Sequence, residues 1–167
     1  MKRIFISLAV VLALVAVMAV PAMAAEEQNL GASVSVNEFI SITLTDTSPT
    51  GITFGSVNDG STDNPDTAQS ETTPAVSVNV ASETNVDVDL GIKGDEVTGL
   101  PLSNWKYSTT YAGTKSGLTT SYVAFDTNVS PGASSDLWHW LDVPDGTTAG
   151  SYNTNFYYKA IATGGSF

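Results

Sequence analysis

The sequence predicts an all-β protein, an antiparallel β-sandwich of jelly-roll or immunoglobulin-like topology. Three observations lead to this prediction. Apolar residues recur at every second position in several short runs, clusters of Gly, Pro, Asn, Asp and Ser separate these runs, and no run has the apolar spacing of an amphipathic helix. Seven or eight short strands without helices are typical of sandwiches that bury one face of each sheet.

The clearest alternation lies between residues 30 and 44. Small and apolar residues hold one parity in Leu30–Val36 and again in Ile40–Leu44, while mostly polar residues hold the other. The alternation slips at Glu38-Phe39, which predicts two strand segments joined by a bend or bulge. We expect the second segment to pair within its own domain. The first has two possible partners, its own sheet or the sheet of a neighbouring molecule.

Further strands are predicted along the rest of the chain, each bounded by turn residues. They are Ile52–Val57, Val76–Val80, Val86–Ile92, Trp105–Ser108, Thr119–Phe125, Leu137–Val143 and Ser151–Ala162. A long polar loop is predicted from Asn58 to Thr73. Val76–Val80 and Val86–Ile92 each place apolar residues on one parity and mostly polar residues on the other. We therefore expect these two strands to be antiparallel neighbours with one buried and one solvated face.

The first 24 residues have the three parts of a secretory signal peptide. A positive start precedes an apolar run from Ile4 to Val20, and Ala22 and Ala24 provide the small residues of a cleavage site. Pro21 and the Ala-x-Ala end disfavour the alternative, a retained membrane anchor. We therefore expect cleavage before Ala25, an extracellular or cell-surface location, and no stable membrane anchor after cleavage.

Composition disfavours several kinds of partner. The chain has 17 acidic and six basic residues, and the predicted cleavage removes two of the basic ones, which moves the formal net charge from −11 to −13. Such a chain can do little to neutralise a phosphate backbone, so nucleic acid and anionic membrane surfaces are disfavoured. No cysteine is present, so the fold depends on packing and hydrogen bonds without disulfides.

Catalysis is not expected from this sequence. His139 is the only histidine, so neither a His-Glu-x-x-His zinc motif nor a multi-histidine site is available, and the flanking Trp138 and Trp140 indicate packing or surface display. A Gly-x-Ser-x-Gly elbow and cysteine nucleophiles are also absent. Asp87 and Asp89 are paired carboxylates, but a strand places both on its solvent face.

Three weaker candidate sites are present. Asp59, Asp63 and Asp66 are candidate calcium ligands, because calcium takes several hard oxygen donors from a flexible loop; a solvated turn is the alternative. Asn128 begins the single glycosylation sequon, Asn-Val-Ser. Five aromatic residues are candidates either for core packing or for a carbohydrate-stacking platform: Trp105, Trp138, Trp140, Tyr157 and Tyr158.

Several of these pieces together resemble one known family. The signal cleavage site, the amphipathic N-terminal strand, the Ile52–Gly60 segment and the Val143–Tyr152 segment followed by an aromatic strand are similar to the TasA/camelysin family of biofilm matrix fibre proteins and the related archaeal bundling pili. The resemblance implies a jelly-roll subunit that polymerises by donor-strand complementation, with residues 25–37 as the donor segment and residues 38–167 as the sandwich. The positions that match such a donor are Leu30, Ala32, Val34 and Val36.

Two functions follow as expectations. The first is a secreted structural subunit that polymerises with copies of itself into an extracellular filament, a pilus or a biofilm matrix fibre, with other matrix components as candidate partners and calcium as the single candidate cofactor. The second is a monomeric surface β-sandwich that binds a ligand, as an adhesin or a glycan binder. An added strand contributes backbone hydrogen bonds while its alternate side chains fill an apolar groove, which suits the first function.

Overall fold

The computed structural model describes residues 31–48 and 51–167. The chain divides into two compact units, residues 1–35 and 36–167, and every described strand belongs to the second. The predicted signal peptide and the predicted donor position Leu30 lie outside the described residues. Within the part of the chain that is described, no helix has the length and apolar character needed to cross a membrane.

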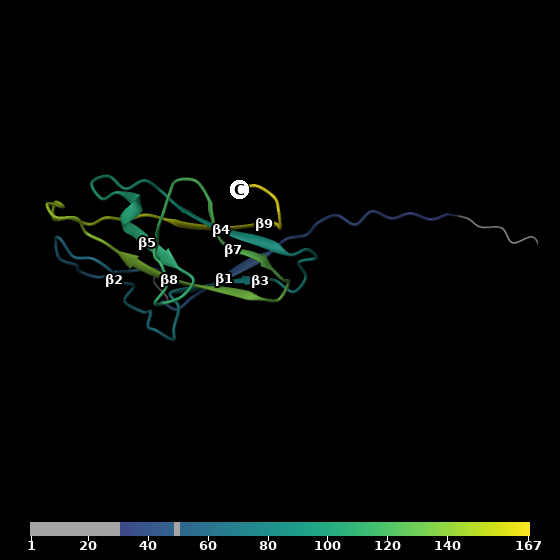
Figure 1. Cartoon of the computed structure of the whole chain (residues 1–167), viewed down its shortest axis with the longest axis horizontal. Coiled ribbons are helices and arrows are strands. Elements are labelled where there is room, and N and C mark those ends of the chain that lie inside the picture. Colours follow the sequence, from purple (N-terminus) through teal and green to yellow (C-terminus); the bar gives the residue numbers. More distant parts are fainter. Residues whose placement is uncertain (1–30, 49–50) are drawn as a thin grey trace, which may run out of the picture. The chain divides into compact units, whose positions relative to one another are not determined.

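The second unit is an antiparallel β-sandwich of two sheets (Figure 1). The larger sheet contains β1 (Ile42–Asp46), β2 (Asn64–Pro65), β3 (Val76–Val80), β5 (Trp105–Ser108), β6 (Ser116–Gly117) and β8 (Ser134–Leu141). Its strand order is β1-β3-β8-β5-β6, and β2 pairs with β8 as well. The smaller sheet contains β4 (Val88–Gly94), β7 (Val123–Val129) and β9 (Phe156–Ala162), in the order β7-β4-β9. A single turn of 3₁₀ helix, Leu102–Asn104, precedes β5.

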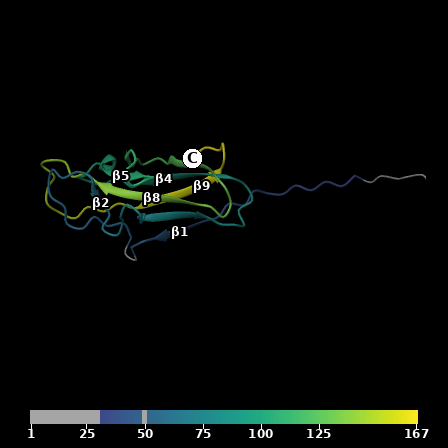
Figure 2. The ribbon, with the colours of Figure 1, turned by 60° about the horizontal axis from the view of Figure 1, so that its bottom comes forward.

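The two sheets enclose one apolar core. On β3 the valines are buried while Ser77 and Asn79 are half-buried, as strand alternation requires. Trp105 of β5 crosses the core and meets Phe54 and Phe156 edge-on, with ring centroids 5.7 and 6.3 Å apart. In Figure 1 the strands of the smaller sheet are drawn above β1, β3 and β8. Turning the ribbon by 60° keeps β4 and β9 on the opposite side of this unit from β1 (Figure 2).

The predicted pairing of Val76–Val80 with Val86–Ile92 is wrong. β3 pairs with β1 and β8 in the larger sheet, whereas β4 pairs with β7 and β9 in the smaller one. Both runs show the same apolar alternation because they cover the same core from opposite sheets. Alternation specifies which face of a strand is buried, and it does not specify the partner.

Several predicted strands form no ladder over all or part of their length. Gly31–Val36 and Ile52–Val57 belong to no strand, and the long closing strand begins at Phe156 and not at Ser151. Conversely, the two-residue strands β2 and β6 lie outside every predicted strand, and β2 lies in the predicted loop from Asn58 to Thr73. Two of these stretches, Ile52–Val57 and Ser151–Thr154, line the candidate site described below.

His139 is fully buried on β8, so the packing alternative is confirmed and surface display is wrong. Its Nε2 lies 3.2 Å from the hydroxyl oxygen of Tyr158, and its ring meets Phe156 edge-on with centroids 4.7 Å apart. Because burial removes water from the charged ring, the pKa of His139 falls from 6.5 to about 3.

We predict that His139 makes the fold acid-sensitive. Its folded pKa of about 3 lies below the ordinary 6.5, so the stability it contributes is present above pH 6.5 and is lost as the pH falls toward 3. The loss reaches on the order of 3–5 kcal/mol near pH 3. Urea unfolding at neutral pH and near pH 4 should show that wild type loses more stability on acidification than His139→Leu. A difference between the two proteins that does not change with pH would contradict this.

Candidate functional site

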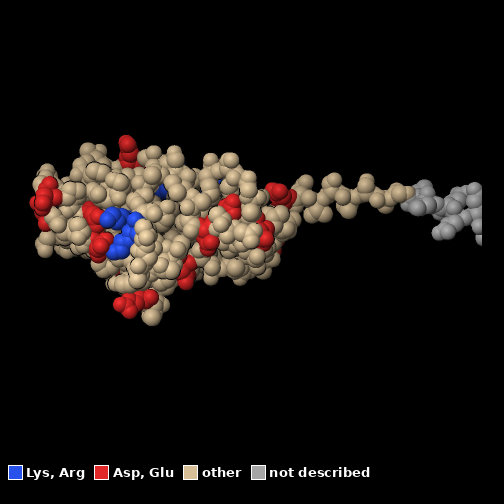
Figure 3. Space-filling model, in the orientation of Figure 1, with Lys and Arg blue, Asp and Glu red and all other residues tan. Residues whose placement is uncertain are grey.

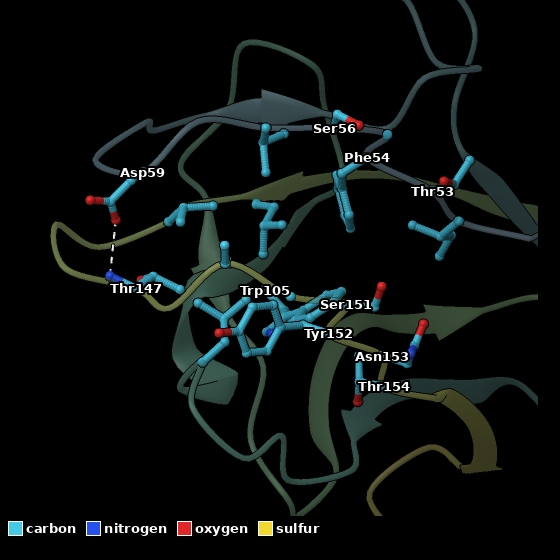
Figure 4. Close-up of a pocket in the computed structure, with 18 of the residues that line it drawn as sticks. Thr53, Phe54, Ser56, Asp59, Trp105, Thr147, Ser151, Tyr152, Asn153 and Thr154 are labelled. Atoms are coloured by element: carbon cyan, nitrogen blue, oxygen red, sulfur yellow. Dashed lines mark hydrogen bonds between the residues drawn. The ribbon is translucent and has the colours of Figure 1, made fainter.

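A groove of about 570 Å³ opens in the sandwich between two segments that belong to no strand (Figure 4). One side is Ile52–Val57, which we call the 52–57 wall. The other leads into β9, and we call its residues 148–155 the 148–155 wall. Buried core side chains line the groove between them, namely Leu100, Trp105, Leu141 and Val143. The base of the groove is therefore made of core side chains that stay buried, and its sides are the two unpaired segments.

Asp66 holds the 52–57 wall on its outer side. Its carboxylate is buried and accepts the backbone N–H of Thr53 at 2.6 Å and of Ala68 at 2.8 Å, while the Thr53 carbonyl accepts the N–H of Thr67 at 2.8 Å. Neighbouring residues of an extended chain direct their backbone groups to opposite sides. The backbone groups of Phe54 therefore point away from Asp66, and no hydrogen bond joins the backbone of Phe54 or Ile52 to another described residue.

The 148–155 wall is held by Asp95. Thr154 Oγ1 accepts the Asp95 N–H at 3.1 Å and donates to the Asp95 carbonyl at 2.8 Å. The Asn155 amide and the Tyr157 hydroxyl donate to the Asp95 carboxylate at 2.8 and 2.9 Å, and these two bonds hold the pKa of Asp95 below its usual value. Across the described residues, no backbone N–H of the 148–155 wall donates a hydrogen bond. Both sides of the groove therefore carry unpaired backbone groups.

Asp59 joins the two sides at one end of the groove. Its carboxylate accepts the backbone N–H of Gly146 at 3.0 Å and of Thr147 at 2.9 Å, and Figure 4 marks the second bond. The adjacent Gly60 has φ +72°, a left-handed conformation that favours glycine, and a Cβ there would meet the Asp145 carboxylate. This contact fixes the separation of the two walls at that end.

The predicted donor positions in the described residues are Ala32, Val34 and Val36. All three are exposed, and the exposed fractions of Val34 and Val36 are 87% and 79%. Gly31–Val36 forms no strand, so its backbone is not used in a ladder. The structure therefore contains an exposed segment with strand-like alternation in its sequence, and a groove whose two sides belong to no strand.

The predicted calcium ligands Asp59, Asp63 and Asp66 have separate roles. Asp59 joins the groove walls, the Asp63 carboxylate pairs with Lys115 at 2.9 Å, and Asp66 is buried beneath Thr53. No cluster of three or more potential metal-ligating side chains occurs among residues 31–48 and 51–167. The sequence placed these three carboxylates in one loop. In the structure Asp59 and Asp66 accept hydrogen bonds from backbone N–H groups, and Asp63 forms an ion pair with a lysine.

The predicted carbohydrate platform does not form, and the core-packing alternative is confirmed for its tryptophans. Trp105, Trp138 and Trp140 are buried, and Tyr158 turns inward toward His139. Of the five candidates only Tyr157 is exposed, at 38%. Asn128 lies exposed on β7 with a left-handed φ of 58°, a conformation that asparagine tolerates well. Its glycosylation stays a prediction.

The surface of the second unit is strongly acidic. Figure 3 shows acidic side chains spread over one face, with basic side chains gathered beside acidic ones at one place. Two lysines form ion pairs in the described residues: Lys106 contacts Asp142, and Lys115 contacts Asp63. Lys93 and Lys159 instead lie over the ring of Tyr122, at 5.1 and 5.6 Å from its centroid.

Comparisons with protein-family models, curated proteins and solved structures give no match for this chain. The class that the fold and site define is therefore an antiparallel β-sandwich with an open groove between two unpaired chain segments. Sequence reasoning did not find this groove. Two predicted strands could have indicated it, because Ile52–Val57 and the start of Ser151–Ala162 have strand-like sequences but no partner in the described sheets.

We predict that Asp66→Ala destabilises the protein by about 1–3 kcal/mol, because it leaves the Thr53 and Ala68 N–H groups without their acceptor. Asp66→Asn keeps one of the two acceptor oxygens and should lose less. Urea unfolding of the three proteins measures the difference. Wild-type stability in Asp66→Ala would show that Asp66 does not hold the 52–57 wall.

Proposed function

We propose that this chain is a secreted structural subunit that polymerises by donor-strand complementation into extracellular filaments, of the pilus or biofilm-matrix kind. The observation that carries the proposal is the groove, because it combines an apolar floor with unpaired backbone groups on both walls. These are the two features that an added β-strand satisfies at once. The occupant we propose is the Leu30–Val36 segment of a second copy.

The proposed occupant fits the groove in length and pattern. Leu30–Val36 and the two walls are each six to eight residues long. Burying Val34 and Val36, which are exposed in the described structure, contributes on the order of 1.5–3 kcal/mol each before the cost of ordering the segment. Two fully exposed valines in a short segment thus gain a large apolar contact by entering a groove of this kind.

The geometry of such a contact favours a filament. A donor segment on one subunit that enters a groove on the next is a heterologous contact, and heterologous contacts repeat without end unless they close into a ring. The acidic subunits repel one another, since the chain has 17 acidic against six basic residues. Directed strand pairing opposes this repulsion in a way that general surface attraction does not.

Export supports the same function. A signal peptide cut before Ala25 leaves Leu30 a few residues from a new N-terminus, where the segment is free to reach another subunit. The resemblance to the TasA/camelysin family and to archaeal bundling pili points to the cell surface or a biofilm matrix as the destination.

A second candidate function is a monomeric adhesin or glycan binder. One observation favours it: Tyr157 and Phe167 are exposed at 38% and 37%, and Lys93 lies 5.0 Å from the Tyr157 ring centroid. Exposed aromatic rings of this kind stack on sugars. This candidate leaves the groove and the exposed valines without a role, so we rank it second.

We predict that the chain from Ala25 to Phe167 forms filaments in negative-stain microscopy and that Val34→Ser with Val36→Ser abolishes them. The serines keep the backbone of the donor segment and remove its apolar face. Ser33→Thr with Ser35→Thr alters the other face of the same segment and serves as the matched control, which should still assemble.

A folded wild-type chain that stays monomeric over a wide range of protein and salt concentrations would contradict the proposed function. Saturable binding of a glycan by that monomer would establish the second candidate instead. Filaments that persist in the double-serine variant would show that polymerisation uses another contact.

A further inference from the structure

We infer that the strand in the groove pairs its backbone with the 148–155 wall, and so extends the smaller sheet from three strands to four. The inference rests on the proposed function, because the occupant is again the Leu30–Val36 segment of a second copy. What it adds is the choice between two walls that both carry unpaired backbone groups. The 148–155 wall is favoured by the direction of its backbone and by its regularity.

The ladder between β4 and β9 fixes the direction in which β9 presents its free backbone groups. Gly94 is opposite Phe156, but the Gly94 N–H donates to the Thr119 carbonyl at 3.0 Å and so does not bond β9. Thr163, by contrast, donates to the Asp87 carbonyl at 2.9 Å across the same ladder. Bonded and non-bonded pairs alternate in an antiparallel ladder. Phe156 therefore directs its N–H and C=O to the edge of β9 away from β4.

That edge has no strand beside it, because β9 is the last strand in the order β7-β4-β9 of the described residues. An unpaired edge next to an apolar surface is the usual template for an added strand. The free groups of Phe156 lie at the end of the groove that this residue lines.

The 148–155 wall continues the geometry of β9 toward the groove. From Ser151 onward its side chains alternate as in a strand, since Tyr152, Thr154 and Phe156 are half-buried while Ser151 and Asn153 are exposed; before Ser151 the chain bends at Ala149 and Gly150. In the described chain, no residue from 147 to 163 has a positive φ. The backbone groups of Tyr152 and Thr154 therefore point the same way as those of Phe156, and they bond no described residue.

The 52–57 wall is less suited to a continuous ladder. Thr53 already uses both of its backbone groups on Asp66 and Thr67, on the side away from the groove. One step beyond Phe54, Gly55 has φ +64°, which breaks the extended backbone. This wall therefore offers only Ile52 and Phe54 before its direction changes. We assign it a packing role, through the Phe54 ring.

The occupant is complementary to this pairing. Ala32, Val34 and Val36 lie on one face of an extended Leu30–Val36 segment, and Ser33 and Ser35 lie on the other. Paired with the 148–155 wall, the apolar face meets the buried floor, and the serines lie beside the exposed side chains of Ser151 and Asn153 on the outer face.

Hydrogen exchange measured by mass spectrometry tests the assignment. The protein is the chain from Ala25 to Phe167 with Val34→Ser and Val36→Ser, so that its own segment does not compete. The probe is a synthetic peptide of residues 28–37 with the native sequence, and the matched control is the same peptide with both valines replaced by serine. We expect amides within 149–155 to exchange at least about tenfold more slowly with the native peptide, and those of 52–57 to change little.

Each outcome decides a separate question. Slower exchange within 149–155 with the native peptide alone supports the inference. Slower exchange confined to 52–57 overturns the inference and leaves strand complementation standing. Filaments of the wild-type chain without any peptide protection in the groove overturn the inference, because the donor then binds elsewhere. If the wild-type chain forms no filaments and the peptide protects no amide in the groove, both the inference and the proposed function are overturned.

Discussion

Backbone groups beside an apolar core need hydrogen-bond partners, and the 52–57 and 148–155 walls carry backbone groups that bond no other described residue. The two sheets pair their strands regularly, and side chains such as Asp66 and Asp95 supply bonds where the chain leaves the ladders. Between the 52–57 and 148–155 walls no strand supplies them. Unpaired groups beside an apolar floor are costly when they are shielded from water. In the proposed assembly, one incoming strand supplies the missing hydrogen bonds and also covers the apolar floor.

The same constraint connects stability with assembly. Without cysteine the fold has no covalent brace, so each subunit depends on its packing and its hydrogen bonds. In the proposed filament, a subunit that completes its neighbour adds buried apolar area and a ladder of hydrogen bonds at the groove. In that proposal the acidic surface opposes unspecific clustering, and the groove selects one contact. The fold, the charge and the proposed polymer are in this way consistent with one another.

The sequence predicted the sandwich because alternation reports burial, and most strands carry it, as Val76–Val80 shows. It did not predict sheet membership, because β3 and β4 show similar apolar alternation in the sequence although they belong to different sheets. It also did not predict the groove, because Ile52–Val57 and the residues before Phe156 have strand-like composition and lack only a partner. Spacing along a loop also did not reveal that two of the candidate calcium ligands, Asp59 and Asp66, accept hydrogen bonds from backbone N–H groups.

Disulfide trapping between two populations tests the central claim most directly, since the native chain contains no cysteine. One population carries Ser35→Cys, or Ser33→Cys for the neighbouring register, and the other carries Asn153→Cys. Opposite side chains of paired strands lie close enough for a disulfide to form. The account predicts a mixed disulfide between the populations, which disappears when Val34 and Val36 are replaced by serine. If filaments assemble but no mixed disulfide forms, that result contradicts the groove as the acceptor site.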